Sequence, residues 1–400
     1  MSSIREIRFW KIIRPLRTVF ATSLGRKSQA TSVLVRVTLA DGHSGLGEIP
    51  TSFVLPHETV GAIGTVLGEA RNALRGVEIM DSPDIHGRLR SRHGQFHMTL
   101  AGLEVALLRA ALAAEGMPEL HWFWRFLAKT GSEKGTFNFS SFAAGTNRQG
   151  CKSSSKVPPG GGKKSRTSPF PPIETDITVP FIPEGNLLER WLGRVARTGF
   201  GTYKVKVSGD VDADMAFVLR AREWLARRVP DADIRLDGNQ GYTARTYLKM
   251  LGRLEKAKVK IELFEQPLRK DDYRGFKEIR SRSPVPVILD ETCFCEADCR
   301  RIVEDRLGHG VNVKLAKSGI DQSQRIMRLA RAAGLKLMIG CMTETMVGLS
   351  AGIHLAAGTG AFDYIDLDSI HLMAHGRRYG DIGLTGPRYV MEDGGCSPTR

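Results

Sequence analysis

Acids and lysines recur at a regular spacing in the second half of this chain, each on a short apolar run. In chain order they are Lys204 and Lys206, Asp237, Glu265, Asp290, and Lys314. From Lys206 onward the intervals are 31, 28, 25 and 24 residues, which is about the length of a strand, a loop and a covering helix. The spacing therefore predicts a separate strand for each acid, for Lys314 and for the pair Lys204 and Lys206. In a parallel barrel, the carboxyl ends of those strands would bring all six side chains into one site.

The three acids offer hard oxygen ligands from three consecutive strands. Carboxylates without a nearby histidine or cysteine favour Mg²⁺, with Mn²⁺ able to substitute, and leave coordination positions for substrate and water. The alternative is that each acid forms an unrelated ion pair at the end of its strand. Three such coincidences in succession make that the weaker interpretation, so we predict that Asp237, Glu265 and Asp290 form a magnesium site.

Lysines beside a divalent cation do not help to hold it, because their charge repels it. They can transfer protons instead, since a nearby cation disfavours the protonated form and lets a lysine act as a base near neutral pH. Residues two apart on a strand share a face, so Lys204 and Lys206 point the same way. Lys206 on the second strand and Lys314 on the sixth would face a substrate from opposite sides. One could remove a proton that the other replaces.

The elements that position these residues alternate between strand and helix from residue 173 onward. Strands are predicted at 176–182, 202–207, 233–237, 261–265, 286–290, 311–315, 335–340 and 362–367. Helices are predicted near 184–198, 211–228, 243–257, 271–281, 296–306, 320–333 and 345–357. This order favours an α/β fold with a modified TIM barrel of the (β/α)7β type. No Gly-x-Gly-x-x-Gly opens a helix after any of these strands, which argues against a dinucleotide site.

A smaller α+β unit precedes the barrel. Strand-like alternation covers 3–13 and 30–40, and helical patterns follow at 57–74, 82–90 and 98–114. The 400 residues exceed what one hydrophobic core usually holds. The predicted domains are an α+β unit over 1–125, an insertion over 126–172, the barrel over 173–370 and a C-terminal tail over 371–400 that packs toward the α+β unit.

The insertion is rich in Gly, Ser, Pro and Lys and has few large aliphatic residues. It cannot bury enough apolar surface to offset its ordering entropy, so we expect it to be flexible. Residues 128–170 hold eight basic residues and one acid, a large share of the chain's net charge of +15. The run GGGKKS does not fit a phosphate-binding loop, because Lys163 stands where that motif needs Gly. A basic tract without interleaved aromatic residues is a weak signal for nucleic acid.

The remaining composition excludes several classes of protein. No apolar run approaches the roughly 20 residues of a membrane span, and the first ten residues are charged rather than signal-like. Six cysteines are few for a disulfide scaffold, and the group Cys293, Cys295 and Cys299 lacks both the usual zinc spacing and a nearby histidine. We therefore expect a cytoplasmic protein with no membrane partner.

Several motifs together resemble the enolase superfamily in its muconate lactonizing enzyme subgroup. They are TYKVKV, LDGNQGYT, FEQPL, LDET and VKLAKSGI, followed by GCMTE around Glu344. The similarity covers nearly the whole chain, and the N-terminal unit is similar to that family's capping domain. The resemblance implies an isomerase with one Mg²⁺ per subunit that uses a lysine base to form an enediolate. It also implies a homo-oligomer.

The family's roles can be carried over one residue at a time. The resemblance implies that Asp237, Glu265 and Asp290 bind the metal and that Lys206 and Lys314 are the acid/base pair. Lys204 is expected to stabilise a substrate carboxylate oxygen, and Glu344 to line the site rather than bind the metal. Lys317 and Asp321 are expected to have a solvated, structural role.

The run IDLDSI on the last strand is the most informative within the subgroup. Asp366 and Asp368 resemble the Asp-x-Asp of dipeptide epimerases, most like those of the L-Ala-D/L-Glu type, where the pair would hold the substrate's free α-ammonium by charge. The implied reaction is a 1,1-proton transfer at the C-terminal residue of a dipeptide, through a metal-stabilised enediolate. The alternative is that one of the two acids caps an adjacent segment.

Two other functions stay open on the sequence. One is a cycloisomerase or an N-acylamino-acid racemase of the same fold, whose substrates lack the free ammonium. The other is a non-catalytic protein that binds nucleic acid or another polyanion through the basic insertion. Substrate side chains are expected to contact capping-domain loops near 14–27 and 50–57, where Arg14, Arg17 and Arg26 could receive an acidic side chain.

Overall fold

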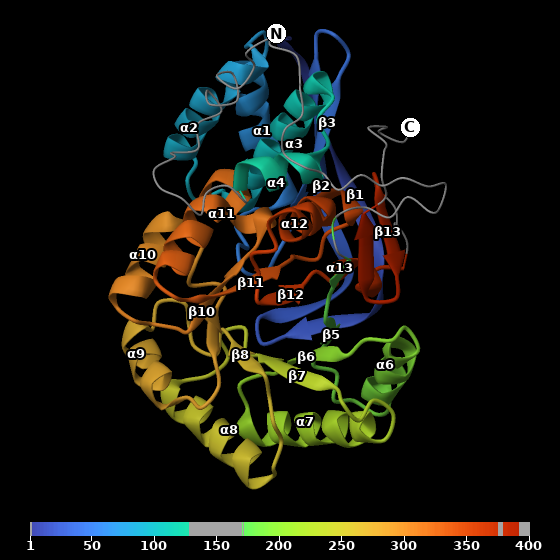
Figure 1. The fold of residues 1–400 in the computed structure, drawn as a ribbon, viewed down its shortest axis with the longest axis vertical. Coiled ribbons are helices and arrows are strands. Elements are labelled where there is room, and N and C mark those ends of the chain that lie inside the picture. The colour runs from blue at the N-terminus through green and yellow to red at the C-terminus, as the bar shows by residue number, and fades with distance from the viewer. Residues whose placement is uncertain (1, 128–169, 171, 375–378, 392–400) are drawn as a thin grey trace, which may run out of the picture.

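The structure, a computed structural model, describes residues 2–127, 170, 172–374 and 379–391. Two units lie one above the other in Figure 1, with the N-terminal domain at the top and the barrel below it. The predicted insertion at 126–172 falls almost entirely outside the described residues. Its expected flexibility therefore stays a prediction.

The N-terminal domain is an antiparallel sheet covered by helices. Its elements are β1 (Ile4–Thr22), β2 (Gly25–Leu39), β3 (Ser44–Pro50), α1 (Val60–Leu74), a 3-10 turn (Ile79–Asp81), α2 (Ser82–Arg92), α3 (His97–Glu115) and α4 (Glu119–Leu127). The sequence patterns did not predict β3, because its glycines interrupt the alternation. A Cβ on Gly47 would lie 2.0 Å from the carbonyl oxygen of Gly102, so glycine allows α3 to pack directly on this strand.

The barrel consists of eight parallel strands in sequential order. The strands are β5 (Ile177–Val179), β6 (Thr202–Lys206), β7 (Asp233–Asp237), β8 (Leu263–Glu265), β9 (Val287–Leu289), β10 (Gly310–Val313), β11 (Lys336–Gly340) and β12 (Tyr364–Asp366). The helices that connect them are α6 (Leu187–Ala196), α7 (Val211–Ala226), α8 (Ala244–Lys256), α9 (Tyr273–Arg282), α10 (Glu296–Glu304), α11 (Leu315–Ala332) and α12 (Met346–Thr359). The predicted (β/α)7β barrel with an N-terminal α+β domain is confirmed. The backbone N–H of Asp176 donates to the carbonyl of Ile365 at 3.3 Å, which brings the first and last strands together.

Two glutamates of the N-terminal domain accept hydrogen bonds at the starts of two barrel helices. Glu48 on β3 accepts from the backbone N–H groups of Thr345 (3.0 Å) and Gly348 (3.1 Å) at the start of α12. Glu104 on α3 accepts from the N–H groups of Ile320 and Asp321, both at 3.0 Å, where α11 restarts after a kink at Gly319. Free N–H groups and the helix dipole favour a carboxylate at these positions. The domains are therefore joined by charge as well as by apolar contact.

Helix α3 lies at the centre of this interface, between β3 and α11. It is the one described helix whose length and composition would allow it to cross a membrane, but 83% of that stretch is buried inside the molecule. Such burial is typical of a core helix. Arg109, near its end, donates to the carbonyls of Leu46 (2.8 Å) and Val347 (2.7 Å), and so links β3, α3 and α12.

The hairpin formed by β1 and β2 reaches from the N-terminal domain to the barrel, as the two dark-blue strands in Figure 1 show. At its tip, Ser23 Oγ donates to the carbonyl of Asn239 at 2.6 Å, in the loop after β7. The N–H of Phe181, after β5, donates to the carbonyl of Ala21 at 3.1 Å. The tip of the hairpin is thus fixed over the carboxyl ends of the barrel strands.

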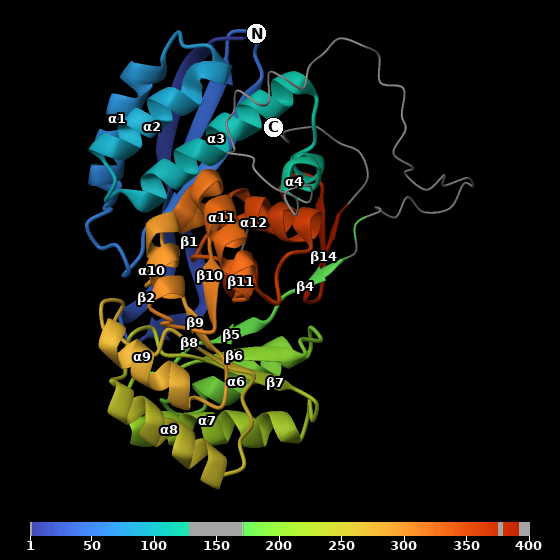
Figure 2. The same ribbon diagram turned by 60° about the vertical axis from the view of Figure 1, so that its left-hand side comes forward.

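The C-terminal segment, expected to pack toward the N-terminal domain, has two kinds of contact. After α13 (Ser369–Leu372), the N–H of Ala374 donates to the carbonyl of Pro15 on β1 at 3.0 Å. Further on, β13 (Ile382–Thr385) and β14 (Arg388–Met391) form a small antiparallel sheet with β4 (Ile173–Glu174), at the side of the barrel in Figure 2. The described part of this segment therefore joins the start of the barrel chain as well as the capping sheet.

The contacts of Glu48 lead to a stability prediction. We expect Glu48→Gln to lower the free energy of unfolding by about 1–3 kcal/mol, because the new amide group turns a donor toward backbone N–H donors. Chemical denaturation followed by circular dichroism measures this. Glu6→Gln is the control, since its ion pair among the described residues is with an exposed arginine, and it should change stability by less than about 0.5 kcal/mol. Equal effects of the two substitutions would contradict the role assigned to Glu48.

The buried His354 leads to a pH prediction. Burial alone would lower its pKa, but hydrogen bonds to Asp381 and Glu119 raise the pKa of His354 to about 9. Its contribution to stability is therefore fully present below the unfolded pKa of about 6.5 and is lost as the pH rises through about 9. We expect the free energy of unfolding to fall by up to roughly 3 kcal/mol more in the native protein than in His354→Gln between pH 6.5 and 9.5. Parallel pH profiles would contradict this.

Candidate active site

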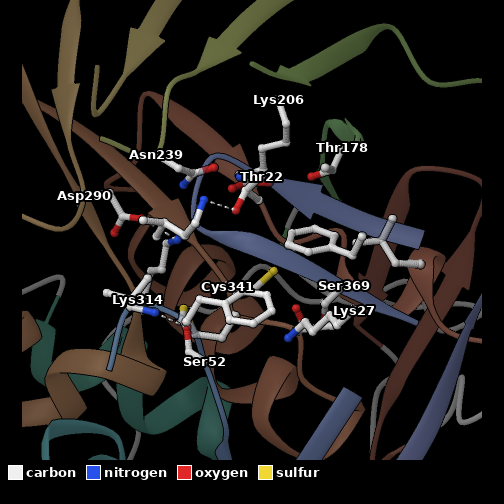
Figure 3. Close-up of a pocket in the computed structure, with 18 of the residues that line it drawn as sticks. Thr22, Lys27, Ser52, Thr178, Lys206, Asn239, Asp290, Lys314, Cys341 and Ser369 are labelled. Carbon is white, nitrogen blue, oxygen red and sulfur yellow. Dashed lines mark hydrogen bonds and ion pairs between the residues drawn. The ribbon is translucent and has the colours of Figure 1, made fainter. Parts of the chain in front are cut away.

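The strand ends bring all six predicted side chains to the carboxyl face of the barrel. Lys204 and Lys206 lie on β6, Asp237 and Glu265 end β7 and β8, and Asp290 and Lys314 follow β9 and β10. Each of the six side chains is buried. Figure 3 shows Lys206, Asp290 and Lys314 around the cavity that opens at this face.

Each predicted acid contacts at least one lysine. Asp237 Oδ2 lies 2.5 Å from Lys206 Nζ, and Asp290 Oδ2 lies 2.7 Å from Lys314 Nζ. Lys204 Nζ lies 3.3 Å from Glu265 Oε2 and 3.6 Å from Asp237 Oδ2. Each acid at the end of the barrel therefore has a lysine beside it, and their charges offset one another in a buried environment.

The chemistry of the three predicted ligands suits a magnesium ion, although the ligand atoms of Asp237, Glu265 and Asp290 do not all lie within 4.8 Å of one another. Asp237 and Glu265 are register partners on adjacent strands. One oxygen of each is already held, since Asp237 Oδ1 accepts from the N–H of Asn239 at 3.0 Å and Glu265 Oε1 accepts from Asn312 Nδ2 at 2.7 Å. The other oxygen of each lies near the Lys204 ammonium. Buried carboxylate oxygens on successive strands, oriented by amide groups, are suited to a hard divalent cation.

A second group of acids lies on the other side of the barrel mouth. It consists of Asp176, Asp366 and Asp368. Among the described residues, these are the side chains able to bind a metal ion whose ligand atoms all lie within 4.8 Å of one another. Lys204 pairs with Asp366, Arg235 pairs with Asp176 at 2.7 Å, and the N–H of Thr178 donates to Asp368 at 2.5 Å. Asp366 and Asp368 were predicted from the sequence, but Asp176 was not. Asp176 begins the first predicted strand, where a single acid gave no spacing signal.

The charges of this region shift several pKa values. Burial lowers the pKa of Lys204, but the carboxylates of Asp366, Glu265 and Asp237 raise it by more. The pKa of Lys204 therefore stands well above its ordinary value. Lys314 behaves in the same way: burial lowers its pKa and Asp290 raises it more. Burial and the nearby charge of Asp366 raise the pKa of Asp368 to about 6. In the state described, Lys204 and Lys314 are therefore strongly held as cations.

Lys317 corrects the expectation of a solvated role. Its side chain is only 2% exposed, and its Nζ lies 2.6 Å from both the backbone oxygen and Oδ1 of Asp290. The helical pattern was predicted to begin at residue 320, but α11 begins at Leu315, before the kink at Gly319. The spacing of three residues between Lys314 and Lys317 is helical and could have indicated that both reach Asp290. Asp321 is half-buried and pairs with Arg325.

Glu344 lies behind the cavity wall rather than in it. Its side chain is buried and accepts from the N–H of Met342 at 3.0 Å, while its backbone carbonyl accepts from Ser369 Oγ at 2.7 Å. Burial and the charge of Glu48 raise the pKa of Glu344 to about 8. The residues beside it, Met342 and Thr343, line the cavity instead.

The N-terminal domain supplies one wall of the cavity through both expected loops. Its lining residues are Phe20, Thr22, Leu24, Lys27, Thr51, Ser52, Phe53 and Val54. The three arginines expected there are elsewhere: Arg26 pairs with Glu184 at 2.7 Å, Arg17 donates to the carbonyl of Ala374, and Arg14 is not among the lining residues. Lys27, next to Arg26, lines the cavity instead.

Comparison with known proteins places this geometry in a family. Residues 186–397, more than half of the chain, match the family described as enolase C-terminal domain-like. The chain belongs to this family. The resemblance to the enolase superfamily is thereby confirmed.

Relatives and solved structures cover nearly the whole chain. A hydrophobic dipeptide epimerase of Citrifermentans bemidjiense is 31% identical over 89% of this chain and 86% of its own length. An L-Ala-D/L-Glu epimerase of Thermotoga maritima is 30% identical, with 92% of each protein covered. The crystal structure of a mandelate racemase/muconate lactonizing protein from Herpetosiphon aurantiacus has a TM-score of 0.79 at 27% identity and covers 98% of this chain and 96% of that one. These relatives and this structure therefore match the N-terminal domain as well as the barrel.

The two groups of acids can be separated by metal titration. We expect Asp237→Asn, Glu265→Gln and Asp290→Asn each to weaken Mn²⁺ or Mg²⁺ binding by at least about 100-fold, since each removes an anionic ligand. Asp368→Asn, in the other group, should leave cation affinity within about threefold. Isothermal titration calorimetry measures both, with circular dichroism to establish folding. Loss of cation binding in Asp368→Asn alone would show that the metal binds to the group of Asp176, Asp366 and Asp368.

Proposed function

We propose that this protein is a Mg²⁺-dependent dipeptide epimerase, an isomerase that inverts the α-carbon of a dipeptide's C-terminal residue. The observation that carries the proposal is the arrangement of the barrel mouth, where two lysines separate two groups of acids. Lys206 on β6 and Lys314 after β10 are four strands apart in a ring of eight, so they face each other across the cavity. The acids of β7 to β9 fill one arc between them, and Asp366 and Asp368 lie on the other arc.

This division matches the charges of a dipeptide. A dipeptide has a carboxylate at one end and a free ammonium at the other, and the bond to be broken lies next to the carboxylate. Asp366 and Asp368 can hold the ammonium, and an oxygen of Asp366 is buried without a hydrogen-bond partner among the described residues. A buried oxygen of this kind costs free energy until a donor reaches it. Muconates and N-acylated amino acids lack the free ammonium group.

Asp237, Glu265 and Asp290 would hold the Mg²⁺ ion, which would neutralise the charge that builds on the substrate carboxylate as the α-proton leaves. Lys204 lies between the two arcs, near Glu265 and Asp366, and can add a hydrogen bond to the same carboxylate. Lys317 and Lys314 fix Asp290 from two sides. These contacts hold the reacting carbon in a defined orientation.

Lys206 and Lys314 then carry the proton transfer. When one lysine is neutral it can take the α-proton from its own face, while the other, still an ammonium, donates a proton to the opposite face. The product has the inverted configuration, and each lysine ends in the state the other had at the start. The two lysines can serve either direction of the reaction, because each can be acid or base.

The similarity to proteins named as dipeptide epimerases, over nearly full length, supports this assignment. The first test is exchange of the substrate α-hydrogen for deuterium in D₂O, over a set of dipeptides with Mg²⁺ and with excess chelator. We expect metal-dependent exchange at the C-terminal residue. Exchange only with N-acylated amino acids, or conversion of a muconate, would favour the other reactions of this fold. The expected cytoplasmic location and homo-oligomeric state stay predictions.

Single lysine variants test the two-base assignment. We expect Lys206→Met and Lys314→Met each to lower epimerisation by about 10²–10⁴-fold, the usual contribution of a positioned acid or base. Each variant should still exchange the α-hydrogen of one epimer and not of the other, because one face keeps its lysine. Lys249→Met, at a lysine on α8, is the control. Loss of exchange with both epimers in both variants, with metal binding intact, would contradict a base on each face.

A further inference from the structure

Lys204 is paired with an acid on the last strand of the barrel. Its side chain is buried, and the carboxylate oxygen nearest to its Nζ is Oδ2 of Asp366. Glu265 Oε2 lies further away at 3.3 Å, and Asp237 Oδ2 lies at 3.6 Å. The positive charge of Lys204 is therefore offset mainly by Asp366. A lysine paired in this way stabilises another carboxylate only weakly, because the field of its charge is largely cancelled by the partner.

Asp366 and Asp368, the two acids at the end of the last strand, are held by different kinds of group. Asp366 pairs with Lys204 through Oδ2, and its Oδ1 is buried without a hydrogen-bond partner among the described residues. Asp368 accepts from the backbone N–H of Thr178 at 2.5 Å and from Cys341 Sγ at 4.0 Å. A cation that reaches these acids therefore competes with a lysine at Asp366 and with neutral groups at Asp368.

One ammonium group can contact both acids. Ligand oxygens of Asp366 and Asp368 lie within 4.8 Å of each other, and an ammonium nitrogen has three hydrogens to donate. Once it pairs with Asp366, two cations share that carboxylate, and in a buried site they repel each other strongly. The third acid of this group, Asp176, is already paired with Arg235 at 2.7 Å and attracts Lys204 less for that reason. The attraction that remains for Lys204 is toward the side where the substrate's carboxylate would lie.

Building on the proposed function, we propose that the substrate's α-ammonium activates the chemical step by displacing the Lys204 ammonium from Asp366, which makes the charge of Lys204 available to the substrate's carboxylate. Negative charge builds on this carboxylate as the α-proton leaves. An unpaired lysine stabilises that charge more than one half of an ion pair does. The free amino group should therefore raise kcat as well as lower KM.

The first experiment compares a dipeptide L-Ala-L-Xaa that exchanges its α-hydrogen with the matching propionyl-L-Xaa, in which a hydrogen replaces the ammonium group. At saturating substrate we expect the propionyl compound to exchange about 10- to 100-fold more slowly. Losing such a donor altogether costs about 10²–10³-fold in kcat, and here the donor is only weakened. Equal kcat values, with only KM changed, would overturn the inference and leave the epimerase proposal intact. Absence of exchange with every dipeptide would instead overturn the proposed function.

Two asparagine variants separate activation from binding. Asp366→Asn removes the charge that holds Lys204, so the ratio of kcat between dipeptide and propionyl compound should fall to within about threefold. Asp368→Asn is the matched control, because it also removes an acid that faces the ammonium but leaves Lys204 paired, so its kcat ratio should stay as in the native protein. Both should raise the KM of the dipeptide by about 10- to 100-fold, as expected for one hydrogen bond to a charged group. A kcat ratio that falls equally in both variants, or in neither, would overturn the inference.

Added ammonium tests the same step without a substitution. With the native protein and the propionyl compound, ammonium chloride should raise the exchange rate saturably, by at least about fivefold, because the ion can pair with Asp366 in place of the missing group. Tetramethylammonium chloride at the same ionic strength has no N–H donor and should leave the rate unchanged. A rate that does not respond to ammonium, or that responds equally to both salts, would overturn the inference.

Discussion

The pairing of buried acids with buried lysines at the carboxyl face of the barrel is the interaction on which the rest of this molecule depends. Isolated charges of this kind cost far too much to bury, and they persist because each faces an opposite charge at short range. Removing one leaves its partner uncompensated. The barrel strands must therefore place every one of these side chains correctly, and the helices and the N-terminal domain hold the strands in that register.

Lys204 connects the two groups of acids. It contacts Asp366 on the last strand and Glu265 on the fourth, so one ammonium lies between the arc suited to a metal and the arc suited to an ammonium ligand. Either ligand must compete with, or displace, charges that the protein has already paired. Binding is then an exchange of ion pairs inside the site, and the opposite charges already present there limit the cost of bringing a charged substrate out of water.

Much of this could be predicted from the sequence, because strand ends in a parallel barrel recur at a nearly constant interval. Asp237, Glu265, Asp290 and the lysines each follow an apolar run of β-forming residues, and all eight strands lie where the patterns placed them. The misses have physical reasons. β3 contains glycines that serve close packing and weaken its pattern, and Lys317 belongs to a helical turn that precedes a kink. Lys27, rather than an arginine nearby, faces the cavity, because only the three-dimensional course of the hairpin decides which of two adjacent residues points inward.

The hairpin of β1 and β2 is attached to the barrel mainly through its backbone and a serine. Ser23 donates to a main-chain oxygen after β7, and Ala21 accepts from a main-chain N–H after β5. Neither contact depends on the side chains at positions 20 and 27. Mutations at those positions can therefore reshape the cavity wall without breaking either of these contacts. The course of the hairpin is thus set by different groups from the side chains that it presents to the cavity.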